Sequence, residues 1–198
     1  MNINELLKIK KKIILASKSP RREYLLKLLG LNFDIIPSNI DESQFILTSP
    51  SDFVETLSKE KAQVIANLHP DTIIIAADTI VWLENEVLSK PKSYDEAFKM
   101  LRKLSNNTHE VFTGITVLHK NATKIISKVS RTEVTFRYLT DEEIDAYIKT
   151  GSPFDKAGAY GIQDDFGAVF VSNIKGCYYN IVGLPLSLLY DILKEFQS

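Results

Sequence analysis

Hydrophobic positions in the first half of the chain form short continuous runs, separated by longer stretches with helical periodicity. The two most apolar runs cover residues 13–16 and 72–77. Runs of this length without polar alternation are typical of strands that are buried on both faces. Residues 33–37 indicate a further strand. The strand at 72–77 is expected to end at Asp78, where the apolar run stops.

Two amphipathic helices are predicted between these strands. The first has Ser19 as its N-cap and Pro20 at its first position, and it stops before Gly30, in line with the residue preferences at helix ends. The second covers about residues 52–68. Its apolar face repeats at helical spacing and consists of Phe53, Val54, Leu57, Val64, Ile65 and Leu68.

The second half of the chain is richer in β-branched residues and in side-chain caps for helices. A hairpin is expected across Glu84-Asn85-Glu86, and long antiparallel strands are expected at 109–118 and 124–138. A further strand pair is predicted at 167–174 and 178–182, around Lys175-Gly176. Helices are indicated by the capping-box pairs Ser93 with Glu96 and Thr140 with Glu143, and by the sequence that starts near Leu184-Pro185.

This mixture predicts an α/β protein with one large mixed, partly antiparallel sheet that is flanked by helices. A length of 198 residues suits a single domain over residues 1–198, with a substantial core and room for two lobes around a cleft. No linker or internal repeat divides the chain. Residues 1–12 are a candidate for a loosely ordered N-terminal extension.

Charge and composition narrow the classes of partner. The chain has 24 basic and 25 acidic side chains, a formal net charge of -1 and one cysteine, Cys177. Nucleic-acid polymers attract proteins with a basic face, so a near-neutral chain is not expected to bind them. One cysteine forms no intramolecular disulfide, and no apolar run is long enough to span a membrane. We therefore expect a cytoplasmic protein without a membrane or nucleic-acid partner.

The helix start at Ser19-Pro20-Arg21-Arg22 is a candidate anion site. Backbone N–H groups at a helix N-terminus bind anions, but arginines in that first turn oppose the helix dipole. A bound phosphate would resolve this conflict, because the guanidinium fork fits its oxygens. The alternative is that both guanidinium groups point into water or pair with acids.

Lys61 and Asp78 are further candidates for chemistry. Lys61 interrupts the apolar stripe of its predicted helix, so its ammonium must either reach water or meet an anion. Asp78 follows the most apolar strand, where α/β proteins place ligands, although capping of the next turn is a common alternative. The three histidines, His69, His109 and His119, are interpreted as incidental. Acids together with cations suit metal-assisted phosphoanhydride hydrolysis.

At this level of detail the chain resembles the Maf family. The similarity covers nearly the whole chain and is carried by segments in the family's order. These are Leu15-Ala16-Ser17-Lys18-Ser19-Pro20-Arg21-Arg22, Lys59-Glu60-Lys61-Ala62, Ala77-Asp78-Thr79, Lys90-Pro91, Phe112-Thr113-Gly114, residues 155–163 and Val182-Gly183-Leu184-Pro185-Leu186.

The resemblance implies a Maf/ITPase-like fold with its active-site cleft between two lobes, and it implies roles for the residues at matching positions. It implies a homodimeric hydrolase that uses Mg²⁺ or Mn²⁺ to split a nucleoside triphosphate into monophosphate and pyrophosphate. Asp78 would be the proton acceptor, and Asp78 and Glu42 the metal ligands. The substrate-binding positions would be Ser17, Arg21, Arg22, Lys61, Thr79, Lys90 and Gln163, of which Arg22, Thr79 and Gln163 are associated with selectivity.

The Ala77-Asp78-Thr79 and Gly161-Ile162-Gln163 segments are similar to those of the family branch that acts on dTTP and UTP. A threonine hydroxyl and a glutamine amide can pair with the edge of uracil or thymine. The alternatives are a 7-methyl-GTP pyrophosphatase of the sister branch and a nucleotide-binding regulator of cell division or septum formation. Asp164 departs from the family pattern, which usually has glycine after the glutamine.

Overall fold

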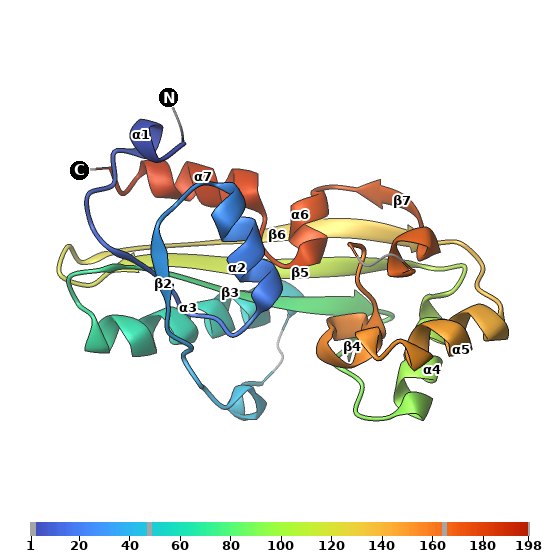
Figure 1. Cartoon of the computed structure of the whole chain (residues 1–198). Helices are drawn as coiled ribbons and strands as arrows, with labels where there is room; N and C mark the ends of the chain where they lie inside the picture. Colours follow the sequence, from blue (N-terminus) through green and yellow to red (C-terminus); the bar gives the residue numbers. More distant parts are fainter. Residues whose placement is uncertain (1–2, 47–48, 164–165, 198) are drawn as a thin grey trace. The chain divides into compact units, whose positions relative to one another are not determined.

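The computed structural model describes residues 3–46, 49–163 and 166–197 (Figure 1). Contacts divide the chain into two compact units. Unit 1 comprises the described parts of Met1–Asp78, Thr113–Ser130 and Gly183–Ser198, and unit 2 comprises those of Thr79–Phe112 and Arg131–Val182. In the part of the chain that is described, no helix is long and apolar enough to cross a membrane.

Unit 1 begins as a parallel sheet. Strand β1 (Ile13–Leu15) pairs in parallel with β2 (Phe33–Ile35) on one side and with β3 (Ile73–Leu83) on the other. Helix α2 (Pro20–Leu28) connects β1 to β2, and α3 (Pro50–Leu68) connects β2 to β3. The chain thus moves first to one side of β1 and then to the other. Such a reversal of strand order creates a ligand-binding position at the carboxyl ends of the strands.

A small-residue core joins α3 to this sheet. Side chains on a strand alternate between faces, so Ile74, Ala76 and Asp78 of β3 share one face. The first two of these belong to a buried apolar cluster with residues of β1 and α3. Its members are Ile14, Ala16, Ala62, Ile65, Ala66, Ile74, Ala76 and Leu118. The alanines allow close packing here, and Asp78 is the next residue along the same face of β3.

The sheet is completed by antiparallel strands and flanked by further helices. The remaining strands are β4 (Glu86–Leu88), β5 (Thr108–His119), β6 (Lys124–Phe136) and β7 (Val171–Lys175). The strand order is β2-β1-β3-β5-β6-β7, and β4 pairs with β3. Pairs β3–β4 and β6–β7 are antiparallel. The predicted mixed α/β sheet is therefore confirmed. The other helices are α1 (Ile3–Leu7), η1 (Glu42–Gln44), α4 (Tyr94–Leu104), α5 (Asp141–Lys149), η2 (Ser152–Asp155), η3 (Ala157–Ala159), η4 (Gly167–Phe170), α6 (Tyr178–Val182) and α7 (Leu186–Lys194).

The prediction that a strand ends at Asp78 was wrong, because β3 continues through Asp78 to Leu83. The hairpin that follows also turns more tightly than expected. Glu84 and Asn85 form the turn with φ values of 51° and 64°, and Glu86 already pairs with Leu83. Positive φ at both central residues is the twist that a two-residue hairpin requires, so no third turn residue is needed.

Residues 178–182 form a helix, α6, and not the predicted strand. The buried Asn180 side chain donates hydrogen bonds to the Val111 carbonyl and to Thr132 Oγ1, each at 2.9 Å. These contacts with distant residues override the strand propensity of the tyrosines and aliphatic residues. The predicted partner strand is also shorter, because residues 167–170 form η4 and β7 begins at Val171.

Two smaller predictions about helices need correction. The buried face of α3 is shifted, so that Val64 and Leu68 are exposed while Ser58, Lys61 and Ala66 are buried. The predicted capping box at Ser93 is incomplete. Ser93 caps α4, but the Glu96 carboxylate accepts from the Lys92 N–H at 2.7 Å instead of from the cap residue.

Candidate functional site

The turn after β1 is organised by two serine hydroxyls. Ser19 caps α2, and its Oγ accepts a hydrogen bond from the Arg22 N–H at 3.4 Å. The buried Ser17 Oγ accepts from the Ser19 N–H at 3.1 Å. Pro20 supplies the preset φ of the first helical position. The short polar side chains thus fix the start of α2, and the predicted cap at Ser19 is confirmed.

Arg22 is turned into the protein and is not directed freely into water. Its Nε donates to the Gly183 carbonyl at 2.9 Å, and one terminal nitrogen lies 3.4 Å from Ser17 Oγ. Burial lowers the pKa of Arg22, the charge of Asp78 raises it, Arg21 lowers it and Glu42 raises it. The guanidinium stays protonated in proteins. A half-buried positive charge therefore lies near the two carboxylates that the family resemblance assigns to the metal.

Lys61 brings those two carboxylates together. Its ammonium donates to Asp78 Oδ1 at 2.6 Å and lies 2.7 Å from Glu42 Oε1. The side chains of Lys61 and Asp78 are only 10% and 8% exposed, whereas that of Glu42 is 56% exposed. The lysine that interrupts the apolar stripe of α3 therefore meets anions, as one of the two alternatives predicted. Asp78 reaches it from the same face of β3 that packs on α3.

The two carboxylates suit a hard divalent cation. Mg²⁺ prefers oxygen ligands and is commonly held by one or two carboxylates together with substrate phosphates and water. Asp78 and Glu42 each direct an oxygen at the same ammonium nitrogen, so both can also approach one cation. Among the described residues, no group of three or more His, Cys, Asp or Glu side chains could hold a metal ion.

Thr79, Lys90 and Gln163 belong to unit 2. Thr79 is half-buried, and Lys90 and Gln163 are exposed. A Cβ added to Gly158 would lie 3.0 Å from a Val81 methyl group, so the loop around Gly158 packs closely on Val81. Val81 and Thr79 are two positions apart on β3 and therefore share one face of that strand.

The Gly158 N–H also donates to the carbonyl of Ser89, the residue before Lys90, at 3.3 Å. Gln163 follows five positions after Gly158 in the same segment. Unit 2 thus gathers the three backbone segments that carry these side chains. Asp164, the departure from the family pattern, lies outside the described residues.

Gly183 is a site residue to which sequence reasoning assigned no role. Its carbonyl accepts from Arg22 Nε, and its φ of 115° belongs to a region that L side chains rarely adopt. The glycine therefore allows the chain to turn a carbonyl toward Arg22 just before α7. The Val182-Gly183-Leu184-Pro185-Leu186 segment was the only signal, and spacing alone did not connect it with residue 22.

Taken together, the unit 1 side chains can bind and cleave a phosphorylated molecule. Arg21, Arg22 and Lys61 supply positive charge, and Asp78 and Glu42 supply carboxylate oxygens. Cations stabilise the charge on phosphate oxygens, and an ionised carboxylate can accept a proton from water. The buried position of Lys61 and Asp78 strengthens these electrostatic effects, because water screens them less.

Comparison with known proteins agrees with this chemistry. The family model described as "Maf-like protein" matches residues 12–196. A protein named dTTP/UTP pyrophosphatase from Bacillus cereus is 49% identical over 187 residues, which cover 94% of this chain and 96% of that protein. A protein of the same name from Bacillus cytotoxicus is 48% identical over 188 residues, which cover 95% and 97%.

A solved structure supports the fold alone. The Staphylococcus aureus Ham1 protein superposes with a TM-score of 0.54 at 15% sequence identity, covering 93% of this chain and 99% of that one. The family model thus matches nearly the whole chain, and the curated relatives share about half of its residues. The chain belongs to the Maf family.

Proposed function

We propose that this chain is a nucleoside triphosphate pyrophosphatase that hydrolyses dTTP and UTP to the monophosphate and pyrophosphate. The observation that carries the proposal is the buried Lys61 ammonium between Asp78 and Glu42, near the Arg22 guanidinium. The curated relatives, which match this chain over 94% and 95% of its length, carry the name dTTP/UTP pyrophosphatase, which supports this choice of substrates.

In this proposal the cationic side chains bind the triphosphate. Arg21 and Arg22 stand in the first turn of α2, where the helix dipole also favours an anion. Ser17 and Gly183 orient Arg22 through the hydrogen bonds described above. Lys61 and Lys90 add positive charge. These groups lower the cost of the negative charge that accumulates as the phosphoanhydride bond breaks.

In this proposal Asp78 accepts a proton from the attacking water. A water oxygen forms a bond to the α-phosphorus, the bond from that phosphorus to the α–β bridging oxygen breaks, and pyrophosphate leaves. The water proton passes to a carboxylate oxygen of Asp78. A divalent cation held by Asp78 and Glu42, Mg²⁺ or Mn²⁺, would supply charge neutralisation and water activation there.

Base selectivity is proposed to come from Thr79 and Gln163, with Arg22. A hydroxyl and an amide can satisfy the carbonyl and N–H groups on the edge of uracil or thymine. A base with a different edge would leave polar groups unpaired, which costs affinity. The 5-methyl group does not alter this edge, so joint activity on dTTP and UTP is expected.

The test is pyrophosphate release from a nucleotide panel in the presence of Mg²⁺ or Mn²⁺. We expect turnover of dTTP and UTP, and we expect Asp78→Asn to lower kcat by at least about 100-fold. Asp34→Asn is the matched control, because Asp34 lies on β2 and pairs with the exposed Lys12. A fully active Asp78→Asn protein would rule out the proposed base.

The same panel separates the alternatives. Preference for 7-methyl-GTP would move the chain to the sister branch, and nucleotide binding without product would favour a regulator of cell division or septum formation. We also propose that the protein is cytoplasmic, which its single cysteine supports. The family resemblance further supports a homodimer. Light scattering tests the dimer, and cell fractionation tests the compartment.

A further inference from the structure

The segment that leads to Gln163 contains a strained turn. Gly158 and Ala159 both have positive φ, 69° and 61°. This conformation costs a non-glycine residue such as Ala159 about 1 kcal/mol or more. Backbone strain of this kind persists where the surrounding structure holds the chain in place, and it is concentrated at functional segments. The contacts of the next residues identify what holds it.

Tyr160 is locked among aromatic rings of unit 2. Its ring centroid lies 5.3 Å from that of His109 and 4.8 Å from that of Phe136, and His109 and Phe136 are 5.2 Å apart. The interplanar angles of 82°, 82° and 83°, in the same order, make all of these contacts edge-to-face, which is a favoured aromatic geometry. The Tyr160 ring therefore has little freedom to move.

A buried hydrogen bond fixes the same tyrosine at its hydroxyl. His109 Nε2 and Tyr160 Oη are 2.7 Å apart, and both residues are buried. His109 Nδ1 is buried and has no hydrogen-bond partner among the described residues. Burial lowers the pKa of His109 to about 3, so its ring is neutral near pH 7. Among the described residues, the polar contact of the buried His109 ring is therefore the one to the Tyr160 hydroxyl.

The next residue is fixed by a second tyrosine. The Gly161 N–H donates to the buried Tyr147 Oη at 3.1 Å. Gln163, two positions later, is exposed. The chain thus passes from two hydroxyl-anchored residues directly to the side chain that is proposed to contact the base. The position of Tyr160 therefore determines the backbone position from which the Gln163 side chain extends.

We propose that His109 is a positioning residue for base selectivity, which holds Tyr160 and thereby sets the backbone that presents Gln163. This inference rests on the proposed function and assigns a role to a histidine that the sequence pattern suggested was incidental. His109 has no contact with substrate in this scheme. It acts by preventing the strained segment from relaxing, because a small displacement of a recognition group weakens its hydrogen bonds to the base.

The test compares kcat/KM for UTP with kcat/KM for CTP, whose bases differ in the edge that Thr79 and Gln163 would contact. Tyr160→Phe removes only the hydroxyl, and His109→Phe removes the nitrogen while keeping an aromatic ring. We expect each to lower the UTP/CTP ratio roughly tenfold, mainly through a higher KM for UTP. His109→Gln, whose amide can still reach Tyr160 Oη, should largely restore the ratio.

Two controls separate positioning from general loss of stability. Leu101→Ala creates a cavity at a fully buried residue of α4, a helix of unit 2 that carries none of the residues bonded to or stacked on Tyr160, and should cost roughly 3 kcal/mol of stability without changing the ratio. In a Gln163→Ala background, Tyr160→Phe should cause no further loss of selectivity, because the two changes act through one group.

The outcomes are distinguishable. A wild-type protein that releases no pyrophosphate from UTP would overturn the proposed function itself. A wild type that prefers UTP, together with folded Tyr160→Phe and His109→Phe proteins that keep this preference, would overturn the role of His109 alone. Additive effects of Tyr160→Phe and Gln163→Ala would do the same.

Discussion

Lys61 has surroundings that differ from those of an ordinary surface lysine. Its ammonium is buried between Asp78 and Glu42, so replacing it by methionine leaves a buried carboxylate without its partner. We expect Lys61→Met to lower the free energy of unfolding by roughly 3 kcal/mol, measured by urea denaturation at pH 7. Activity should be lost as well, because the triphosphate loses a cation.

Lys59→Met is the matched control on the same helix. Lys59 pairs with Glu55 at 2.6 Å, but these side chains are 45% and 34% exposed. Exposed pairs of this type contribute little, so the expected change is below about 0.5 kcal/mol. Equal destabilisation by the two substitutions would contradict the view that Lys61 compensates a buried charge.

His109 gives the protein an expected sensitivity to acid. Its folded pKa of about 3 lies below the ordinary value of 6.5 because burial disfavours the charged ring. Between these values the unfolded chain binds a proton that the folded chain lacks, so stability decreases as the pH falls below 6.5. The slope should approach about 1.4 kcal/mol per pH unit, and it should be absent in His109→Phe. Parallel urea-denaturation results for both proteins from pH 7.5 to pH 5 would contradict this.

The sequence predicted the unusual position of Lys61 but not which carboxylates surround it. A lysine in an apolar stripe is visible from spacing alone, because helical periodicity is a local property. Its partners Asp78 and Glu42 come from β3 and η1, and only the folded chain brings them together. His109 was missed for the same reason, since its partner Tyr160 lies 51 positions away.

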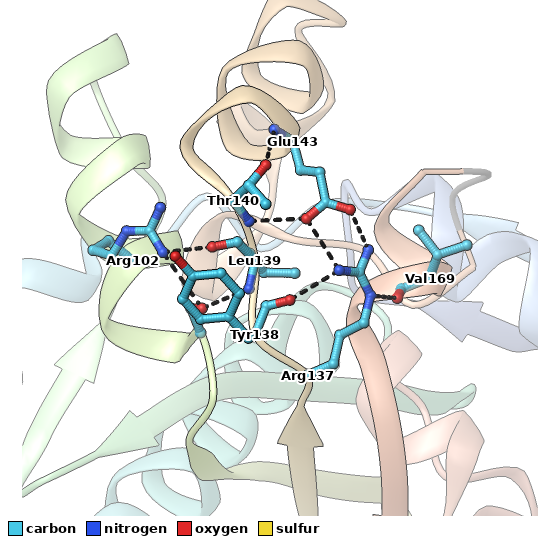
Figure 2. A network of polar contacts seen from close by, with 8 residues as sticks. Arg102, Arg137, Tyr138, Leu139, Thr140, Glu143 and Val169 are labelled. Carbon is cyan, nitrogen blue, oxygen red and sulfur yellow. Dashed lines mark hydrogen bonds and ion pairs between the residues drawn. The ribbon is translucent and has the colours of Figure 1, made fainter.

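At the scale of elements, the two predicted capping boxes differ in a way that can be measured. The box at Thr140 is complete, and Figure 2 shows that its Glu143 carboxylate also receives the Arg137 guanidinium, at 3.0 and 2.7 Å. Arg137 further donates to the Val169 and Tyr138 carbonyls. Its hydrogen bond lowers the pKa of Glu143, so this stabilisation is present above the ordinary value of 4.5 and is lost as the pH falls below it.

We expect Glu143→Gln to lower the free energy of unfolding more than Glu96→Gln does, by about 1 kcal/mol at pH 7. Both residues occupy the third position of a helix, but only Glu143 has an arginine fork that ties α5 to η4. Thermal or urea denaturation at pH 7 and pH 4 measures the difference, which should shrink at pH 4. An equal loss for both variants would mean that the arginine contributes nothing beyond the cap.

Elements with local signals were the ones that the sequence placed well. Helices α2, α4 and α5 start at side-chain caps that lie within a few residues of their partners, and each began where it was predicted. Helix α6 was missed, because Asn180 and its partners Val111 and Thr132 are far apart in sequence. Strand propensity is a weak guide when such contacts decide the conformation.

For the whole molecule, the sequence predicted the kind of sheet but not its strand order. The reversal at β1 depends on pairing between residues such as Ile13, Phe33 and Ile73, which no local pattern records. That reversal brings the Ser17–Arg22 turn and Asp78 to one edge of the sheet. The grouping of Thr79, Lys90 and Gln163 came from the family resemblance, and the structure supplies its physical basis in the packing of Gly158.

A ligand that binds only the folded protein raises its free energy of unfolding, so nucleotide binding can be measured as a gain in stability. Asp78→Asn is the suitable protein, because it keeps Arg21, Arg22 and Lys61 but lacks the proposed base. At a UTP concentration of 100 times Kd, with Mg²⁺ present, the expected gain is about 2.7 kcal/mol of unfolding free energy. CTP at the same concentration should give a smaller gain, because its base edge differs. Adding Arg22→Leu should abolish both, since the triphosphate then loses the cation that Ser17 and Gly183 orient. Equal stabilisation by UTP and CTP would place all of the binding energy in the phosphates and remove Thr79 and Gln163 from base recognition.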